Sequence, residues 1–159
     1  MTSASNTRLD PLPPLDQRPT RVRYTVMAFV CVLSFLTYFD RVCIMRAQRL
    51  IENDLHITHA QMGIIFGAFW LAYALFEMPG GWMGDRFGAR STLTRVVLAW
   101  SLFTALSGSA TGFLSLLTYR FLFGVGEAGA FPNIARVQQR WLPATAQGRA
   151  SGILWLVAR

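Results

Sequence analysis

The sequence predicts an all-α integral membrane protein, and three observations lead to this fold class. Hydrophobic residues make up 53% of the 159 residues and charged residues only 14%, which lies outside the usual range of a soluble domain. The apolar residues form segments of about 20 residues, the length that a helix needs to cross a bilayer. The basic residues are all arginine and mostly flank these segments, so they indicate membrane topology and not nucleic-acid binding.

The elements follow in order along the chain. Residues 1–23 are polar and rich in proline and arginine, and we expect them to form a disordered cytoplasmic tail. Four segments are then long enough to span a membrane, and a fifth begins close to the end of the sequence, at about 24–45, 62–83, 92–110, 112–133 and 150–159. Because a helix cannot cross a bilayer within residues 150–159, we expect 24–159 to be part of a six-helix transmembrane domain in a longer protein.

The arginines also predict an orientation. Nine of them lie in the tail and in the connections that follow the second and fourth segments, whereas the first outer loop holds two. We therefore expect a multi-pass protein of the inner (plasma) membrane. The positive-inside rule places its N-terminus in the cytoplasm.

The connection between the second and third segments carries a sequence motif, GWMGDRFGAR, at residues 81–90. A glycine at Gly81 would allow close helix approach, and Gly88 would permit a tight reversal. Asp85 is an anion placed to meet a cation or a helix N-terminus. The motif resembles the signature loop of the major facilitator superfamily at five positions: Gly81, Asp85, Arg86, Gly88 and Arg90.

Further motifs resemble one branch of that superfamily, the anion:cation symporters. The fourth segment reads LTYRFLFGVGEAGA at 117–130, and the first contains Tyr38-Phe39-Asp40-Arg41. The resemblance implies a twelve-helix fold, of which this chain would hold the first four spans and the start of a fifth. It also implies symport of a sugar acid or another organic carboxylate with a proton, sodium being the alternative. Glu77 departs from the branch, where glutamine is expected.

The first and fourth apolar segments hold four charges, Asp40, Arg41, Arg120 and Glu127, each at a cost of about 2.5–3.5 kcal/mol on insertion scales. Arg120 and Glu127 are two helical turns apart and share one face. The resemblance assigns Arg41 and Arg120 to the substrate anion, and Asp40 and Glu127 to the proton. We expect Asp40 to stay paired with its neighbour Arg41, which leaves Glu127 as the better coupling carboxylate. The alternative is a purely structural charge network.

Two tyrosines complete the predicted substrate site. Tyr38 shares a helix face with Arg41, and Tyr73 shares one with Glu77, so we expect a common polar cavity. The planar guanidinium fork suits a carboxylate, and tyrosine hydroxyls suit a polyol. A substrate anion on the arginines would release a carboxylate that takes up a proton, so anion and proton would favour each other's binding.

Other functions are less consistent with the sequence. It shows no nucleophile–base pair and no zinc-ligand spacing, since His56 and His59 stand alone in a polar loop. We therefore expect no enzyme activity, catalytic residue, cofactor or metal. The expected partners are an organic anion, a proton, the lipid bilayer and a C-terminal half that this sequence lacks, with no nucleic acid. Two alternatives stay open: a major facilitator carrier of another substrate class, and a membrane fragment that does not transport.

Overall fold

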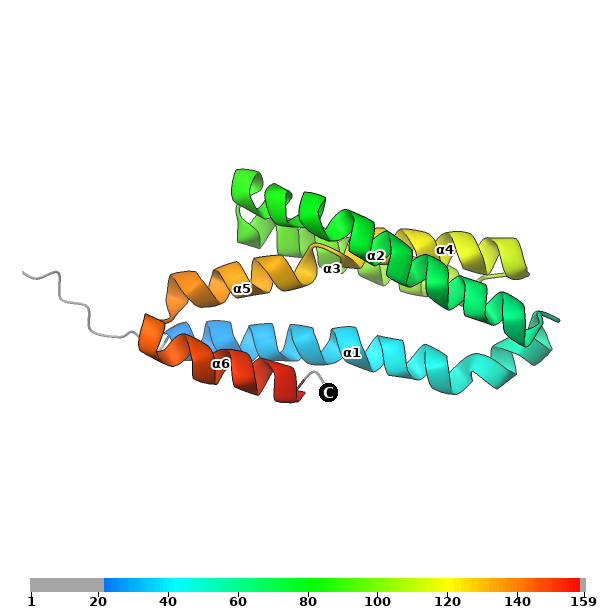
Figure 1. Cartoon of the computed structure of the whole chain (residues 1–159), viewed down its shortest axis with the longest axis horizontal. Coiled ribbons are helices and arrows are strands. Elements are labelled where there is room, and N and C mark those ends of the chain that lie inside the picture. Colours follow the sequence, from blue (N-terminus) through cyan, green and yellow to red (C-terminus); the bar gives the residue numbers. More distant parts are fainter. Residues whose placement is uncertain (1–21, 158–159) are drawn as a thin grey trace, which may run out of the picture.

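The computed structural model describes residues 22–157, and within that range it contains six α-helices and no strand. Figure 1 shows α2, α3 and α4 grouped on one side of the molecule and α1 with α6 on the other, with α5 between them. The helices are α1 (Val22–Asp54), α2 (His59–Phe87), α3 (Ala89–Gly108), α4 (Phe113–Glu127), α5 (Ala130–Trp141) and α6 (Ala144–Val157).

Each predicted span overlaps at least one helix, but the helices begin and end at different residues from those predicted. In the described residues, α1 and α2 are the two helices long and apolar enough to cross a membrane, judged by length and composition. The segment predicted at 92–110 is α3, and residues 150–157 of the segment predicted at 150–159 lie in α6, which begins at Ala144. The predicted tail falls outside the described residues except for Val22 and Arg23, which already belong to α1.

The segment predicted at 112–133 is covered by two helices, because α4 ends at Glu127 and α5 begins at Ala130. Pro132 explains the break. Proline lacks an N–H donor, and its ring clashes with the carbonyl four residues earlier, here that of Ala128. Asn133 stabilises the break, since its amide Nδ2 donates to the carbonyls of Gly129 at 2.7 Å and Gly80 at 3.1 Å.

Glycines allow α2 to approach the break closely. A Cβ atom on Gly80 would lie 2.5 Å from the Cα of Gly129, whereas one on Gly81 would meet Pro132 at 3.5 Å, an ordinary contact. The close helix approach that was predicted at Gly81 is therefore made by Gly80, one residue earlier. Gly88 has φ 84°, a conformation that favours glycine, so it makes the tight reversal between α2 and α3.

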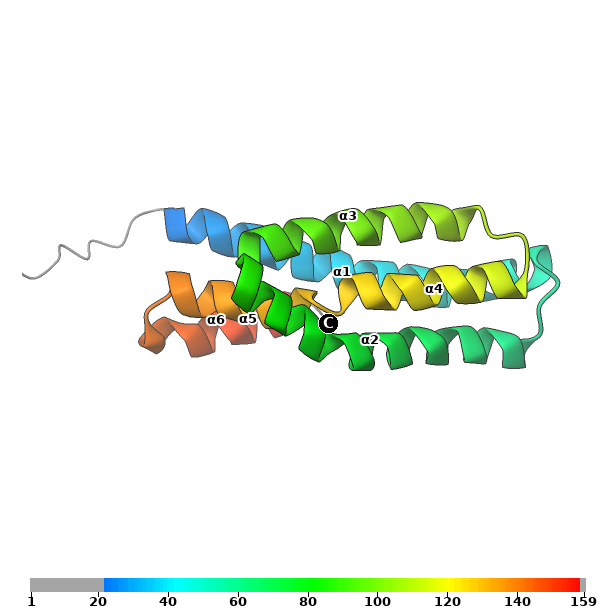
Figure 2. The same ribbon diagram turned by 90° about the horizontal axis from the view of Figure 1, so that it is seen from above.

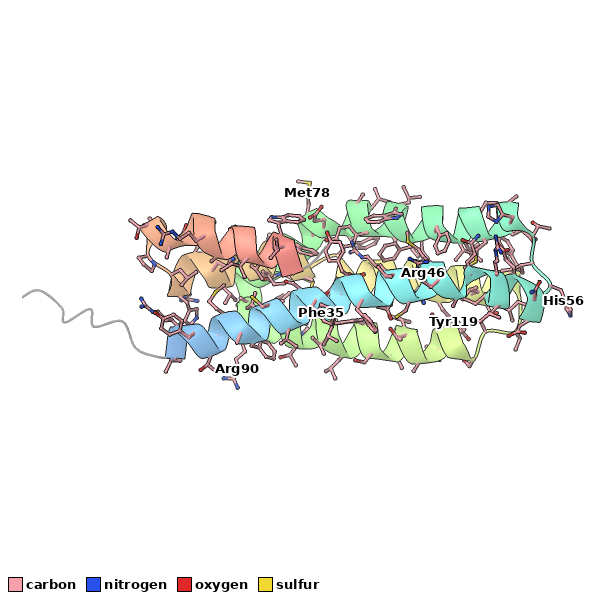
Figure 3. All side chains as sticks on the ribbon, turned by 90° about the horizontal axis from the view of Figure 1, so that it is seen from below. Phe35, Arg46, His56, Met78, Arg90 and Tyr119 are labelled. Carbon is pink, nitrogen blue, oxygen red and sulfur yellow. The ribbon has the colours of Figure 1, made fainter. Side chains whose placement is uncertain are left out.

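The outward surface of the bundle is apolar. Met78 is 84% exposed and Phe35 is also exposed, and Figure 3 shows Met78 directed away from the helices. At one end of the bundle, the α1–α2 connection contains a capping box between Thr58 and Gln61. The α3–α4 connection lies at the same end, and the α2–α3 and α5–α6 connections lie at the other (Figure 2).

Candidate functional site

Two ion pairs join α1 to α4. Arg41 Nη2 lies 2.8 Å from Glu127 Oε1, and Arg120 Nη1 lies 3.4 Å from Asp40 Oδ2. The pairing differs from the expectation that Asp40 stays with Arg41. Consecutive residues of a helix point in different directions, so each of these two finds its partner on the facing helix.

The ion pairs are buried and incompletely hydrogen-bonded. The Glu127 side chain is fully inaccessible to solvent, and those of Arg41, Arg120 and Asp40 are nearly so. In the described part of the chain, Glu127 Oε2 and the Nε atoms of Arg41 and Arg120 have no hydrogen-bond partner. Buried polar atoms are nearly always satisfied in proteins, so the site retains capacity for a ligand or for water.

Aromatic rings surround the Arg41 guanidinium. Its central carbon lies 5.2 Å from the Tyr38 ring centre, 5.0 Å from that of Tyr73 and 4.9 Å from that of Trp70. Phe69, which the sequence reasoning missed, lies at 5.3 Å. These distances fit cation–π interaction. Three of the four predicted substrate residues, Tyr38, Arg41 and Tyr73, therefore converge. We call Arg41–Glu127 and Arg120–Asp40 the crossed pairs, and they bring Arg120 to the same region.

The described residues do not form one common polar cavity around the predicted substrate residues, because Tyr38 and Tyr73 do not line the pocket that Arg41 and Arg120 share. Arg41 and Arg120 both line a pocket of about 20 Å³, which is room for about one water molecule. Glu77 does not join this site. It lies in a separate cavity of about 500 Å³ with Ser34 and Gln138, and no ion pair to it is formed within residues 22–157.

The signature loop contains a third carboxylate–guanidinium pair. Asp85, near the end of α2, pairs with Arg136 of α5, a residue that the sequence reasoning did not select. Arg86 stacks over Trp82 at 5.6 Å, and Arg90 is exposed. The sequence had led us to expect that this loop acts as a conformational gate in which Asp85 pairs with groups of the missing half. In the structure Asp85 instead pairs with a cation of the same chain.

Comparison with known proteins identifies the family. The sequence model of the Major Facilitator Superfamily matches residues 30–157. The chain belongs to this superfamily. The finding confirms the predicted family and the predicted all-α fold, and it makes the chain part of an integral membrane protein.

Individual relatives in the comparison are named as transporters of particular compounds. The chain is 38% identical over 139 residues to a probable sulfoacetate transporter of Cupriavidus necator, covering 87% of this chain and 32% of the relative. It is 37% identical to the hexuronate transporter of Bacillus subtilis, covering 80% and 30%, and 36% identical to the D-galactonate transporter of Escherichia coli, covering 85% and 31%. The chain thus spans about a third of the length of these relatives.

A solved structure supports the fold. The inward-facing, unoccupied form of a bacterial homolog of the human lysosomal transporter Spinster superposes with a TM-score of 0.82 at 27% identity, over 87% of this chain and 29% of that one. These relatives are named as transporters, in agreement with the expectation that the chain is not an enzyme.

Proposed function

We propose that this chain is the N-terminal third of a secondary transporter that moves a small organic anion together with a proton by alternating access. The observation that carries the proposal is the crossed pairing of Arg41 with Glu127 and Arg120 with Asp40. Two guanidinium groups held beside two carboxylates can exchange a carboxylate partner for a substrate anion. The relatives support the class of substrate, since sulfoacetate, hexuronate and D-galactonate are all organic anions.

The coupling follows from the charges. An anion that binds Arg41 replaces Glu127 as its partner, and a guanidinium can hold a carboxylate with two parallel hydrogen bonds. Glu127 is then buried without a cation, so it takes up a proton. Because the linkage is reciprocal, the proton strengthens anion binding to the same extent. The loaded site is nearly neutral, which lowers the cost of exposing it to the opposite side of the membrane between two rocking halves.

The aromatic rings around Arg41 suit a polyhydroxylated acid. Tyrosine and tryptophan combine a broad apolar surface with one polar group, and Tyr38, Trp70 and Tyr73 present both close to the guanidinium. The carboxylate of a sugar acid would bind Arg41 and Arg120, and its hydroxyl groups would meet the tyrosine hydroxyls.

The test uses the full-length transporter, with the reading frame continued beyond Arg159, reconstituted in vesicles with hexuronate, D-galactonate and sulfoacetate as probes. Glu127→Gln imitates a permanently protonated acid. We expect counterflow of the transported anion to persist and accumulation driven by a pH gradient to be lost. Accumulation at the wild-type level would reassign coupling to Asp40. Accumulation that follows a sodium gradient instead would exclude the proton.

The anion site is tested separately. Arg41→Lys and Arg120→Lys keep the charge and lose the planar fork, so anion affinity should fall by at least about tenfold for each lost hydrogen bond to the charge. Arg140→Lys, at an exposed position of α5, is the control. Unchanged affinity in both variants would assign the crossed pairs to structure alone and favour the alternative of a fragment or carrier without anion transport.

The orientation is also open to test. In a background without Cys31 and Cys43, single cysteines at Thr58 and Gly112 should react with an impermeant thiol reagent from outside. A cysteine at Ala89, in the opposite set of connections, should not. The reverse pattern would contradict a cytoplasmic N-terminus.

A further inference from the structure

An apolar groove with two arginines at one end lies between α1, α3 and α5. It has a volume of about 600 Å³, and its lining includes Arg90 from the start of α3 and both Arg140 and Trp141 from the end of α5. Apart from Thr94, the other lining residues are small or apolar. No carboxylate of the described residues lines the groove, so its only formal charges are positive.

The two arginines are available to a ligand. Neither guanidinium forms an ion pair with another residue in the range 22–157, and both side chains are exposed. Figure 3 shows Arg90 directed away from the helices at the end of the bundle where α1 begins. A planar guanidinium can hold a phosphate group with two parallel hydrogen bonds. This end of the groove therefore suits a phosphate.

The groove continues along the membrane-spanning part of the bundle. A second, mainly apolar cavity of about 620 Å³ shares Phe29 and Val97 with the first and extends along α3 to Ala105. From Arg90 to Ala105, the helix rises by about 22 Å, whereas one leaflet of a bilayer contributes about 15 Å of hydrocarbon. Phe29 and Leu98 are 62% and 65% exposed, so the groove is open to the surrounding bilayer and long enough for an acyl chain.

We propose that this groove binds an anionic phospholipid, with the phosphate on Arg90 and Arg140 and one acyl chain along α1 and α3. A free phosphate would leave the apolar groove unfilled, and an uncharged lipid would leave the arginines unpaired. Trp141 follows Arg140, and tryptophan is enriched where a membrane meets water. Basic pockets between transmembrane helices on the cytoplasmic side bind anionic headgroups, and in the proposed orientation this is the inner end. The binding does not depend on anion transport.

The first test places a fluorophore in the groove. A single cysteine at Thr94, which lines the groove and is exposed, is labelled in full-length protein whose native cysteines have been replaced, in nanodiscs of phosphatidylcholine. Brominated phosphatidylglycerol quenches the label on contact, and we expect half-maximal quenching at a several-fold lower mole fraction than with brominated phosphatidylcholine. A label at Leu102, an exposed position of the same helix outside the lining, should respond equally to both lipids. Equal responses at Thr94 as well would overturn the proposal.

Charge variants test the two arginines. Arg90→Gln and Arg140→Gln should each lower the preference for phosphatidylglycerol about fivefold, the attraction expected of one arginine, and added salt should lower it further. Arg149→Gln is the matched control, because it removes the same charge from an exposed position of α6 outside the groove. We expect it to leave the preference unchanged. An equal loss in Arg149→Gln would indicate attraction to net charge alone and would overturn the site.

Two other occupants predict different results. Glycerophosphoglycerol is the same headgroup without acyl chains, and an excess of it should not relieve the quenching at Thr94. Relief would assign the groove to a soluble phosphate. A second copy of the chain would exclude both lipids from the label, and single cysteines at Thr94 would then crosslink between copies. Either outcome would overturn the lipid site.

Discussion

The two α1–α4 ion pairs and the Asp85–Arg136 pair use the same chemistry in different surroundings. Glu127 has 0% of its side chain exposed, whereas Asp85 has 58% and Arg136 has 36%. Exposed pairs contribute about 0–1 kcal/mol, because water replaces a lost partner. A buried charge that loses its partner has no such replacement. Burial therefore makes the α1–α4 pairs a determinant of stability, whereas the Asp85–Arg136 pair should contribute much less to it.

The sharpest test of this comparison is Arg41→Ala, which leaves Glu127 buried without its cation. We expect a loss of about 3–5 kcal/mol in the free energy of unfolding, measured by denaturation of the purified protein in detergent. Combining it with Glu127→Gln should restore most of the loss, because the remaining side chain is neutral. Arg46→Ala, an exposed position on the same helix, should change stability by no more than about 0.5 kcal/mol. Similar losses in both single variants would contradict the role given to burial.

A second variant tests the contact that holds α2 against the break between α4 and α5. Gly80→Ala should cost about 1–3 kcal/mol through overpacking, because its Cβ would meet the Gly129 backbone at 2.5 Å. Gly81→Ala is the matched control one residue away and should be neutral or slightly stabilising, since alanine favours a helix more than glycine does. Thermal unfolding in detergent measures both. Equal costs would indicate that α2 contacts α5 through a different face.

Breaking the exposed Asp85–Arg136 pair should change the free energy of unfolding less than breaking a buried pair. Asp85→Asn should change unfolding by about 0–1 kcal/mol, and the difference should shrink as salt is added. We expect its main effect on the balance of open and closed forms, measured as the rate of crosslinking between cysteines at the inner ends of the helices. Exchanging the two charges, in Asp85→Arg combined with Arg136→Asp, should restore the wild-type balance. A loss as large as that of Arg41→Ala would remove the distinction between the two kinds of pair.

The smallest expected effect lies in the last two turns of α1, beyond the apolar segment predicted at 24–45. A hydrogen bond from Gln48 at 2.7 Å, followed by contact with His59 at 3.0 Å, holds the pKa of Glu52 below its ordinary value. A lowered pKa in the folded state stabilises folding at pH above the ordinary pKa, and this contribution is lost as the pH falls through the folded-state pKa. Gln48→Ala should raise the pKa of Glu52 towards its ordinary value, which carboxyl NMR titration measures. An unchanged titration would assign the shift to His59, with His59→Ala as the comparison.

The sequence identified four charges in the first and fourth apolar segments, and the structure brings them together, but the sequence did not show how they pair. Charges inside apolar segments are few and costly, so Asp40, Arg41, Arg120 and Glu127 could be selected from composition and spacing alone. Their partners depend on how α1 and α4 are rotated against each other. The pattern of a single helix does not contain that rotation. It depends in part on where α2 holds α4, for example at Gly124, where a Cβ would lie 2.6 Å from the carbonyl oxygen of Phe69 in α2.

The break in the fourth segment left a local signal that spacing arguments overlooked. Hydropathy alone favours one continuous helix over 112–133, but Pro132 removes the hydrogen bond to the carbonyl four residues earlier. That rule marks Ala128–Gly129 as a candidate break but does not decide it alone, because α2 continues through Pro79. The roles of Asn133 and Arg136 had no comparable signal, because both depend on contacts with α2.

The crossed pairing has a consequence for how the protein is made. Asp40 and Arg41 enter the membrane with α1, and their partners arrive only when α4 emerges from the ribosome. Until then, the adjacent opposite charges of α1 must be tolerated by lipid, by water or by the insertion machinery. Once Glu127 has been synthesised, every charge of the two pairs has its partner within the same nascent segment. These four charges can therefore be paired as soon as α4 is present, without a contribution from any later part of the chain.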